Sequence, residues 1–145
     1  MAYSDKSATS TVTVSTVARK KTWSDLDLTL AKHPIKKDIM PLKDDNAIQN
    51  AVKNLVLSNF YERPFQHDKG ANLVALLFEP ANPFTALEIE ESIKEVLSLY
   101  EKRIRVGKIK CKDQVDRNTW NVEINYTIKS FGVPSKIDIV LKRLR

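Results

Sequence analysis

Cysteine, glycine and long apolar runs are scarce in this chain, and each scarcity excludes a class of protein. Cys111 is the one cysteine among 145 residues, so no disulfide can form within the chain. Two histidines and no second thiol are too few ligands for a cysteine–histidine metal site. No apolar run is long enough to span a bilayer, and no secretory signal is visible at the N-terminus. The sequence therefore predicts a protein without cofactor or metal that does not enter a membrane.

Two nucleotide-binding signals are also absent. The three glycines form no phosphate-binding loop. The net charge of +6 is basic, but its 24 cations are interleaved with 18 acids, and the aromatic residues do not cluster with the cations. This distribution favours a solvated surface that complements acidic protein partners, with no nucleic acid bound. A basic nucleic-acid-binding module remains the alternative that steep salt dependence of DNA affinity would support.

The composition changes near Trp23. Residues 1–22 are rich in serine and threonine and poor in large apolar groups, which predicts a flexible N-terminal tail. Valines among β-branched threonines between Thr11 and Val17 leave open that the tail forms a strand on assembly. Residues 23–145 are the length of one domain. An alternating entry segment opens this domain, and Trp23, Leu26 and Leu28 are its candidates for packing on the core.

Two helices are predicted from apolar periodicity. The first, Asn46–Leu57, is expected to be capped by Asp44 or Asp45, and its apolar face contains Ile48, Val52, Leu55 and Val56. The second begins at a capping box formed by Thr85 and Glu88 and ends near Tyr100. Its apolar stripe contains Ile89, Ile93, Val96, Leu97 and Tyr100.

After Arg103 the apolar period changes to two, which predicts strands. Gly107 marks an expected bulge in the first strand, and residues 120–128 form the most regular alternation in the chain. A third strand contains Ile137, Ile139 and Leu141. The predicted fold class is α+β, with two main helices packed on a three-stranded antiparallel meander.

The segment between the two helices contains an unusual motif. Its residues are Glu62, Arg63, Pro64, Phe65, Gly70, Phe78, Glu79 and Pro80. The two prolines fix turns, and Gly70 permits a backbone conformation that other residues avoid. With the helices on either side and Glu101-Lys102-Arg103 after the second, this order resembles the sheath-initiator baseplate wedge proteins of contractile phage tails and their type VI secretion relatives. Tyr61 and Lys102 stand where that family usually has glycine and often has proline.

The resemblance implies a structural, non-enzymatic role in the virion. It implies a tail-baseplate location, assembly in the host cytoplasm and membership of a sixfold assembly. The implied partners are the other baseplate wedge proteins and the first ring of tail sheath subunits. The corner at Glu101, Lys102 and Arg103 is the implied contact with the helical core bundle of the wedge, with Arg103 favoured because its planar fork makes paired hydrogen bonds. Favourable placement of cations at a helix C-terminus is the structural alternative.

The sheath is expected to start on the last strand. β-Augmentation would add an extended arm of a sheath subunit to an open sheet edge through main-chain hydrogen bonds. The residues of this predicted sheath-binding strand are Lys136, Ile137, Asp138, Ile139, Val140, Leu141 and Lys142. Basic residues around it are expected to discourage pairing between copies.

Some proteins of this family have been described as lysozymes, so catalysis is the rival hypothesis. A glycosidase needs two carboxylates across the scissile bond, and Glu62 and Glu79 are the attractive pair here. No polar-aromatic groove is visible beside them. The structural alternative pairs Glu62 with Arg63 or another base, and lets Glu79 accept from backbone amides near Pro80. We expect the structural role.

Overall fold

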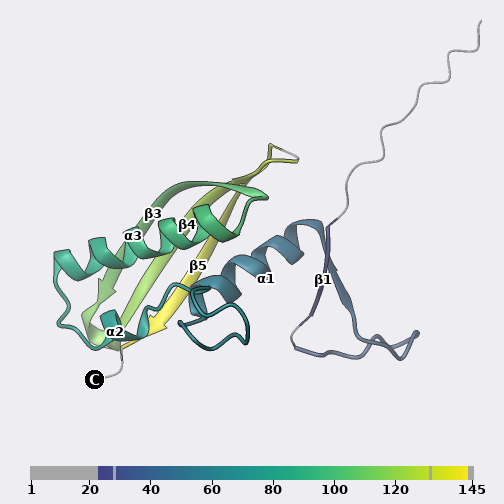
Figure 1. Ribbon diagram of the computed structural model, residues 1–145, viewed down its shortest axis with the longest axis horizontal. Helices are drawn as coiled ribbons and strands as arrows, with labels where there is room; N and C mark the ends of the chain where they lie inside the picture. The colour runs from purple at the N-terminus through teal and green to yellow at the C-terminus, as the bar shows by residue number, and fades with distance from the viewer. Residues whose placement is uncertain (1–22, 28, 131, 144–145) are drawn as a thin grey trace, which may run out of the picture.

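A computed structural model describes residues 23–27, 29–130 and 132–143. The predicted tail, residues 1–22, and Leu28 lie outside this part of the chain. Figure 1 shows an α+β fold in which a long helix and a three-stranded sheet make up one body and a small hairpin lies beyond it. The elements are β1 Ser24–Leu26, β2 Pro41–Lys43, α1 Asp44–Leu57, α2 Val74–Leu77, α3 Pro83–Tyr100, β3 Ile104–Gln114, β4 Thr119–Ile128 and β5 Pro134–Lys142.

The predicted antiparallel meander is confirmed, with the order β3-β4-β5. Trp120 lies opposite Asp113 of β3 and Leu141 of β5. The register of β3 against β4 shifts between Val106 and Ile109, which confirms the bulge at Gly107. Pro134 begins β5, where the missing amide of a proline is tolerated at the start of an edge strand.

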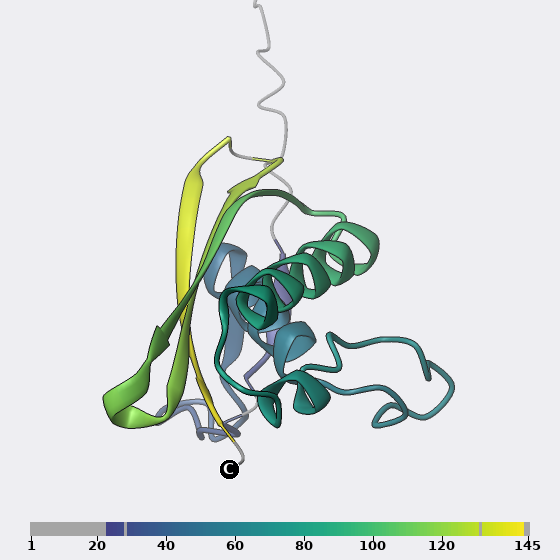
Figure 2. The ribbon, with the colours of Figure 1, turned by 90° about the vertical axis from the view of Figure 1, so that its left-hand side faces the viewer.

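The helices cover one face of the sheet and leave the other face open (Figure 2). β4 alternates strictly between buried and half-buried residues, because its even-numbered side chains point toward the helices. The predicted apolar faces of both helices are confirmed, with Tyr100 partly buried. The core combines these faces with the inward residues Trp120, Val122, Ile124, Tyr126, Ile128, Ile139 and Leu141.

The start of α1 differs from the prediction. Lys43 is the N-cap, and no side chain makes a capping hydrogen bond. The Asp44 carboxylate instead accepts from the backbone amide of Trp23 at 3.3 Å, while the Asp44 amide donates to the Trp23 carbonyl at 2.7 Å. The Asp45 carboxylate lies 3.4 Å from the Ser135 hydroxyl of β5. Both carboxylates therefore make tertiary contacts and do not cap α1.

The predicted capping box at the start of α3 is wrong. Asn82 is the N-cap, and its side-chain oxygen accepts from the Thr85 amide at 2.7 Å. Pro83 follows at the start of the helix, where its fixed φ is favourable. Thr85 lies inside the first turn and is buried, and its hydroxyl donates to the Pro80 carbonyl at 3.0 Å. Glu88 is therefore one turn too late to complete a capping box.

The entry segment forms a two-stranded sheet that was not predicted. β1 pairs with β2, and Ser24 lies opposite Lys43. Trp23 packs against the core as expected. Leu26 does not, because 49% of it is exposed. The hairpin attaches to the body next to the start of α1 (Figure 1). Several apolar side chains of this region are exposed to solvent.

Candidate functional site

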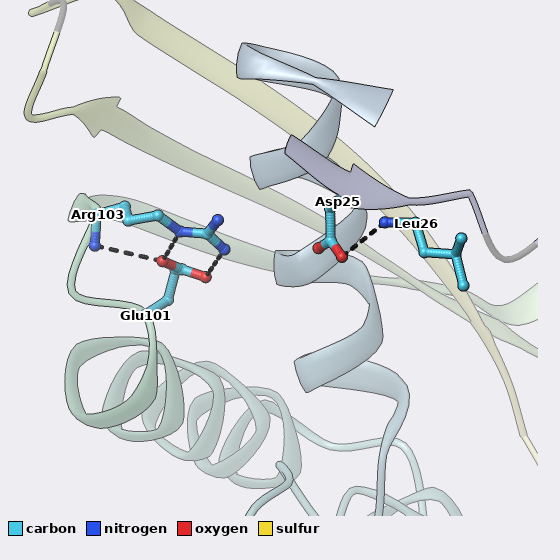
Figure 3. Close-up of polar contacts among 4 residues, drawn as sticks. All are labelled: Asp25, Leu26, Glu101 and Arg103. Carbon is cyan, nitrogen blue, oxygen red and sulfur yellow. Dashed lines mark hydrogen bonds and ion pairs between the residues drawn. The ribbon is translucent and has the colours of Figure 1, made fainter. Parts of the chain in front are cut away.

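The corner between α3 and β3 is built around a buried carboxylate. Glu101 follows the last residue of α3 and is 5% exposed. Its two oxygens accept from Nε and Nη2 of Arg103 at 2.6 Å each, and one also faces the Arg103 amide at 3.3 Å (Figure 3). The Arg103 fork is thus directed into its own chain. Lys102 between them is the exposed cation of the corner.

Arg103 also interacts with the entry segment, through Trp23 and Asp25. Its guanidinium lies over the Trp23 ring, 5.5 Å from the centroid. The hydrogen bonds to Glu101 raise the pKa of Arg103 despite partial burial, and the charges of Glu101 and Asp25 add to this effect. The guanidinium therefore stays charged and fixed. This geometry supports the helix-terminus role more directly than a free docking fork.

The tertiary structure brings the 62–65 motif beside this corner. A hollow of about 620 Å³ is lined by Asp25 of β1, Arg63 of the loop and Tyr100, Glu101, Lys102 and Arg103 of the corner, with Lys69 and three α1 residues completing it. Sequence reasoning identified the two motifs separately and did not join them. Asp25 and Lys69 were missed, since neither lies in a recognisable pattern.

Within the motif, Arg63 and Gly70 contact Ser58 at the end of α1, whereas Phe65 is exposed. The Arg63 guanidinium donates to the Ser58 hydroxyl at 3.1 Å at the end of α1. Gly70 has φ +155° and packs so closely on the Ser58 carbonyl that a Cβ would overlap it. Phe65 is 97% exposed, so packing within this chain does not account for its place in the motif, and its structural role stays a prediction.

The end of the motif supports α3. Phe78 is the C-cap of α2 and is exposed, as are Glu79 and Pro80. The Thr85 hydroxyl, which donates to the Pro80 carbonyl, also lies 3.5 Å from the Glu79 carboxylate. Among the described residues, the Glu79 carboxylate therefore faces the Thr85 hydroxyl of α3, whereas the sequence predicted that it would accept from backbone amides near Pro80.

Glu62 makes different contacts from those expected. Its carboxylate accepts from the Asn59 backbone amide at 2.9 Å and from the Asn59 side chain at 2.7 Å, instead of from Arg63. These hydrogen bonds lower the pKa of Glu62. A general acid in glycoside hydrolysis needs a raised pKa, so Glu62 is poorly suited to that role. Neither Glu62 nor Glu79 lines the hollow at the α3–β3 corner.

The predicted sheath-binding strand is β5, which lies at one edge of the sheet. Ile137, Ile139 and Leu141 face the helices, while the residues between them are exposed. Lys136 does not project outward along the edge. Its ammonium lies 3.4 Å from both Glu123 of β4 and Asp138, on the open face of the sheet.

The two sheet edges differ at one outward backbone amide. On β3, the Cys111 amide points away from β4 and donates to the Glu90 carboxylate of α3 at 2.6 Å. Cys111 and Val122 are therefore a non-hydrogen-bonded pair, so Val122 directs its backbone groups to Ile139 of β5. The next residue, Val140, consequently directs its amide and carbonyl outward. Among the described strands none pairs with this edge.

Cys111 is a packing residue rather than a reactive thiol. It packs against the core at its edge. Burial, with smaller effects from Glu90 and Asp113, raises the pKa of Cys111 to about 12. The thiolate is therefore scarce at neutral pH.

In the described ranges, no three metal-ligating side chains come together. No helix of this part of the chain is long and apolar enough to cross a membrane.

Comparison with known families decides which fold family this is. The model of the baseplate wedge protein gp25 family matches residues 43–132, from the end of β2 to the loop before β5. This chain belongs to the gp25 baseplate wedge family. It is 29% identical over 108 residues to baseplate wedge protein gp25 of Enterobacteria phage T4, which covers 74% of this chain and 81% of the T4 protein. The resemblance seen in the sequence is confirmed, and the protein is a structural component of the tail baseplate.

Two solved structures share the fold of this gp25-family protein. One is described as a tail lysozyme from Geobacter sulfurreducens, with TM-score 0.63, 20% identity and coverage of 68% of this chain and 89% of the other. The second is a chain of the anti-feeding prophage baseplate, determined with sixfold symmetry, with TM-score 0.61 and 11% identity. It covers 86% of this chain and 88% of the other, so the likeness extends beyond the region matched by the family model.

Proposed function

We propose that this gp25-family protein initiates the tail sheath by accepting a strand of a sheath subunit at the free edge of β5. The observation that carries the proposal is the difference between the two sheet edges. Both β3 and β5 are edge strands without a further partner strand among the described residues, but on β3 a carboxylate of α3 occupies one outward amide, that of Cys111. An unpaired edge is normally avoided in soluble proteins, and assembly with a partner is one reason to keep it.

The other partners are the remaining baseplate wedge proteins, and the assembly is sixfold. The α3–β3 corner docks on the helical core bundle of the wedge, and Lys102 is its accessible charge. The hollow beside it has four cations and two acids among its lining residues, which favours an acidic partner surface. The sixfold symmetry of the structurally similar anti-feeding prophage baseplate supports this arrangement.

The role is structural, not enzymatic. The lowered pKa of Glu62 and the separate local contacts of Glu62 and Glu79 support this assignment. The name lysozyme is that of a structurally similar protein. Its 20% sequence identity to this chain supports a shared fold and not a shared activity.

The strand proposal is tested at Val140. Val140→Pro removes an outward amide while leaving the ladder to β4 in place, and the Val140 side chain is already 64% exposed. Baseplates containing a folded Val140→Pro protein should form but fail to nucleate an extended sheath, as seen by electron microscopy. Val140→Thr keeps the amide and should support normal sheaths.

Normal sheath polymerisation on Val140→Pro baseplates would exclude augmentation at this edge. Ile139 is less suitable for this test, although it lies at the centre of the strand. Its backbone groups pair with Val122 of β4, so a proline there would disrupt the sheet itself.

A further inference from the structure

Three exposed aromatic side chains occur together in the loop between α1 and α2. We define the aromatic loop as residues 60–67. Phe60, Tyr61 and Phe65 are 43%, 79% and 97% exposed, respectively. Figure 2 shows that the segment between α1 and α2 stands away from the body of the molecule. Burial in this chain therefore does not explain why this loop contains large apolar rings.

The backbone of the aromatic loop is held in an unfavourable conformation. Tyr61 and Phe65 have φ of +64° and +65°, which is uncommon for residues with bulky side chains. The Tyr61 amide donates to the His67 carbonyl at 2.9 Å and closes the loop, and the two rings lie 5.7 Å apart. Strained backbone conformations cluster at functional sites, and here the strained residues carry exposed aromatic rings.

The aromatic loop is continuous with the α3–β3 corner. The Tyr100 hydroxyl donates to the Asp68 carbonyl at 3.0 Å, just after the loop. The Lys69 ammonium lies 5.8 Å from the centroid of the Tyr100 ring. Lys69 and Tyr100 line both the corner hollow and a second hollow of about 510 Å³. The second hollow is also lined by Tyr61, Phe65 and His67. The corner and the loop therefore form one surface.

We propose that the aromatic loop is the apolar half of the surface that docks on the wedge core bundle, with Phe65 as its anchor. This inference rests on the proposed function of the corner. Exposed aromatic side chains that enter a partner's pocket commonly dominate binding energy, whereas exposed charges at the rim contribute mainly to orientation and association rate. The half-buried Lys69 lines the same hollow as Phe65, and the exposed Lys102 lines the adjoining corner hollow, so the two lysines can provide that charged rim.

The chemistry of the surface defines the partner. On the core bundle of the proposed function we expect an apolar pocket wide enough for a phenyl ring, with carboxylates beside the pocket. The carboxylates would face Lys69 and Lys102, because the Arg103 fork is already bound to Glu101. Arg63, bonded to Ser58, holds the loop in place rather than reaching the partner.

The test uses the full chain and the larger wedge proteins of the same tail as the probe. Phe65→Ala should weaken binding to the purified wedge complex by about tenfold or more, as expected for an interface hot spot. Phe84→Ala is the matched control, since Phe84 is also exposed, by 77%, but lies at the opposite end of α3. Phe84→Ala should bind as tightly as the unchanged chain, and both variants should keep the native melting temperature.

Lys102→Glu separates this inference from the docking proposal on which it rests. If Lys102→Glu weakens binding and Phe65→Ala does not, the aromatic loop is not part of the docking surface, although the corner is. Equal weakening by Phe65→Ala and Phe84→Ala would also overturn the inference, since general apolar adhesion would explain it. Loss from both Phe65→Ala and Lys102→Glu, with unchanged binding of Phe84→Ala, supports the loop as an anchor. No loss from either Phe65→Ala or Lys102→Glu overturns both the corner docking and the inference.

Discussion

Glu101 and Arg103 are bound to each other across the turn that joins α3 to β3, with both carboxylate oxygens engaged by the guanidinium. Glu101 is buried and Arg103 is partly buried, so the pair fixes the direction in which β3 leaves the helix. The same contact draws Arg103 toward Trp23 and the start of the hairpin. One ion pair therefore joins the helix, the sheet and the entry segment.

Replacing Arg103 should destabilise the fold. Arg103→Ala leaves a buried carboxylate without its partner, and a loss of about 1–3 kcal/mol in the free energy of unfolding is expected after allowance for partial exposure of the arginine. Lys102→Ala should change this free energy by no more than about 0.5 kcal/mol. Urea denaturation of both variants measures the difference. Equal stability of Arg103→Ala and the unchanged chain would show that the pair contributes nothing to folding, and would favour docking as its role.

The helix cap can be tested at two positions. Asn82→Ala removes the side-chain oxygen that accepts from Thr85, and should lower the free energy of unfolding by about 1 kcal/mol. Glu88→Ala should have a much smaller effect, because Glu88 is not at the N3 position of this helix. A larger loss from Glu88→Ala in thermal denaturation would restore the capping box predicted from the sequence.

The contact between Gly70 and Ser58 predicts a strong intolerance of side chains. Gly70→Ala would place a Cβ against the Ser58 carbonyl at a backbone φ that L-residues rarely adopt, so we expect a loss of about 2–3 kcal/mol. Gly132→Ala is the control. Its φ of +64° is also unfavourable, but nothing lies within 4 Å, and the expected loss is about 1 kcal/mol. Similar losses at the two glycines, measured by denaturation, would contradict the close contact.

The Cys111 thiol predicts how stability changes at alkaline pH. Its pKa is about 12 in the folded chain against an ordinary value of 9.0, so the unfolded chain releases the proton first as pH rises. The free energy of unfolding should therefore be insensitive to this group below pH 9.0 and fall between pH 9.0 and about 12. Cys111→Ala should make this fall shallower, with the raised pKa of Tyr126 accounting for part of the remainder. An unchanged slope in Cys111→Ala would contradict the assignment.

Catalysis is tested by Glu62→Gln and Glu79→Gln. Because the two side chains make separate local contacts, neither change should alter a trace of peptidoglycan-degrading signal in a purified preparation. Turbidity loss of a cell-wall suspension measures it. Robust activity that disappears in either variant would promote the enzyme hypothesis over the structural one.

Local sequence patterns determined most of the architecture. The apolar faces of α1 and α3, the alternation of β4 and the bulge at Gly107 each depend on residues close together in the chain, so periodicity predicted them. The family motif could also be recognised from the sequence, because it is defined by the order and spacing of its residues. The predicted N-terminal tail lies outside the described residues.

Contacts between distant residues decided what the patterns could not. Asp44 and Asp45 have the chemistry of helix caps, but Trp23 and Ser135 occupy them. The Glu90 carboxylate occupies the outward Cys111 amide of β3, and the register of the three strands then places the Val140 amide and carbonyl on the outer side of β5. The sequence by itself determined the elements and the family, since both follow from local order. Only the tertiary structure decided that Arg103 lies over Trp23 and that the aromatic loop lies beside the α3–β3 corner, because these contacts join residues far apart in sequence.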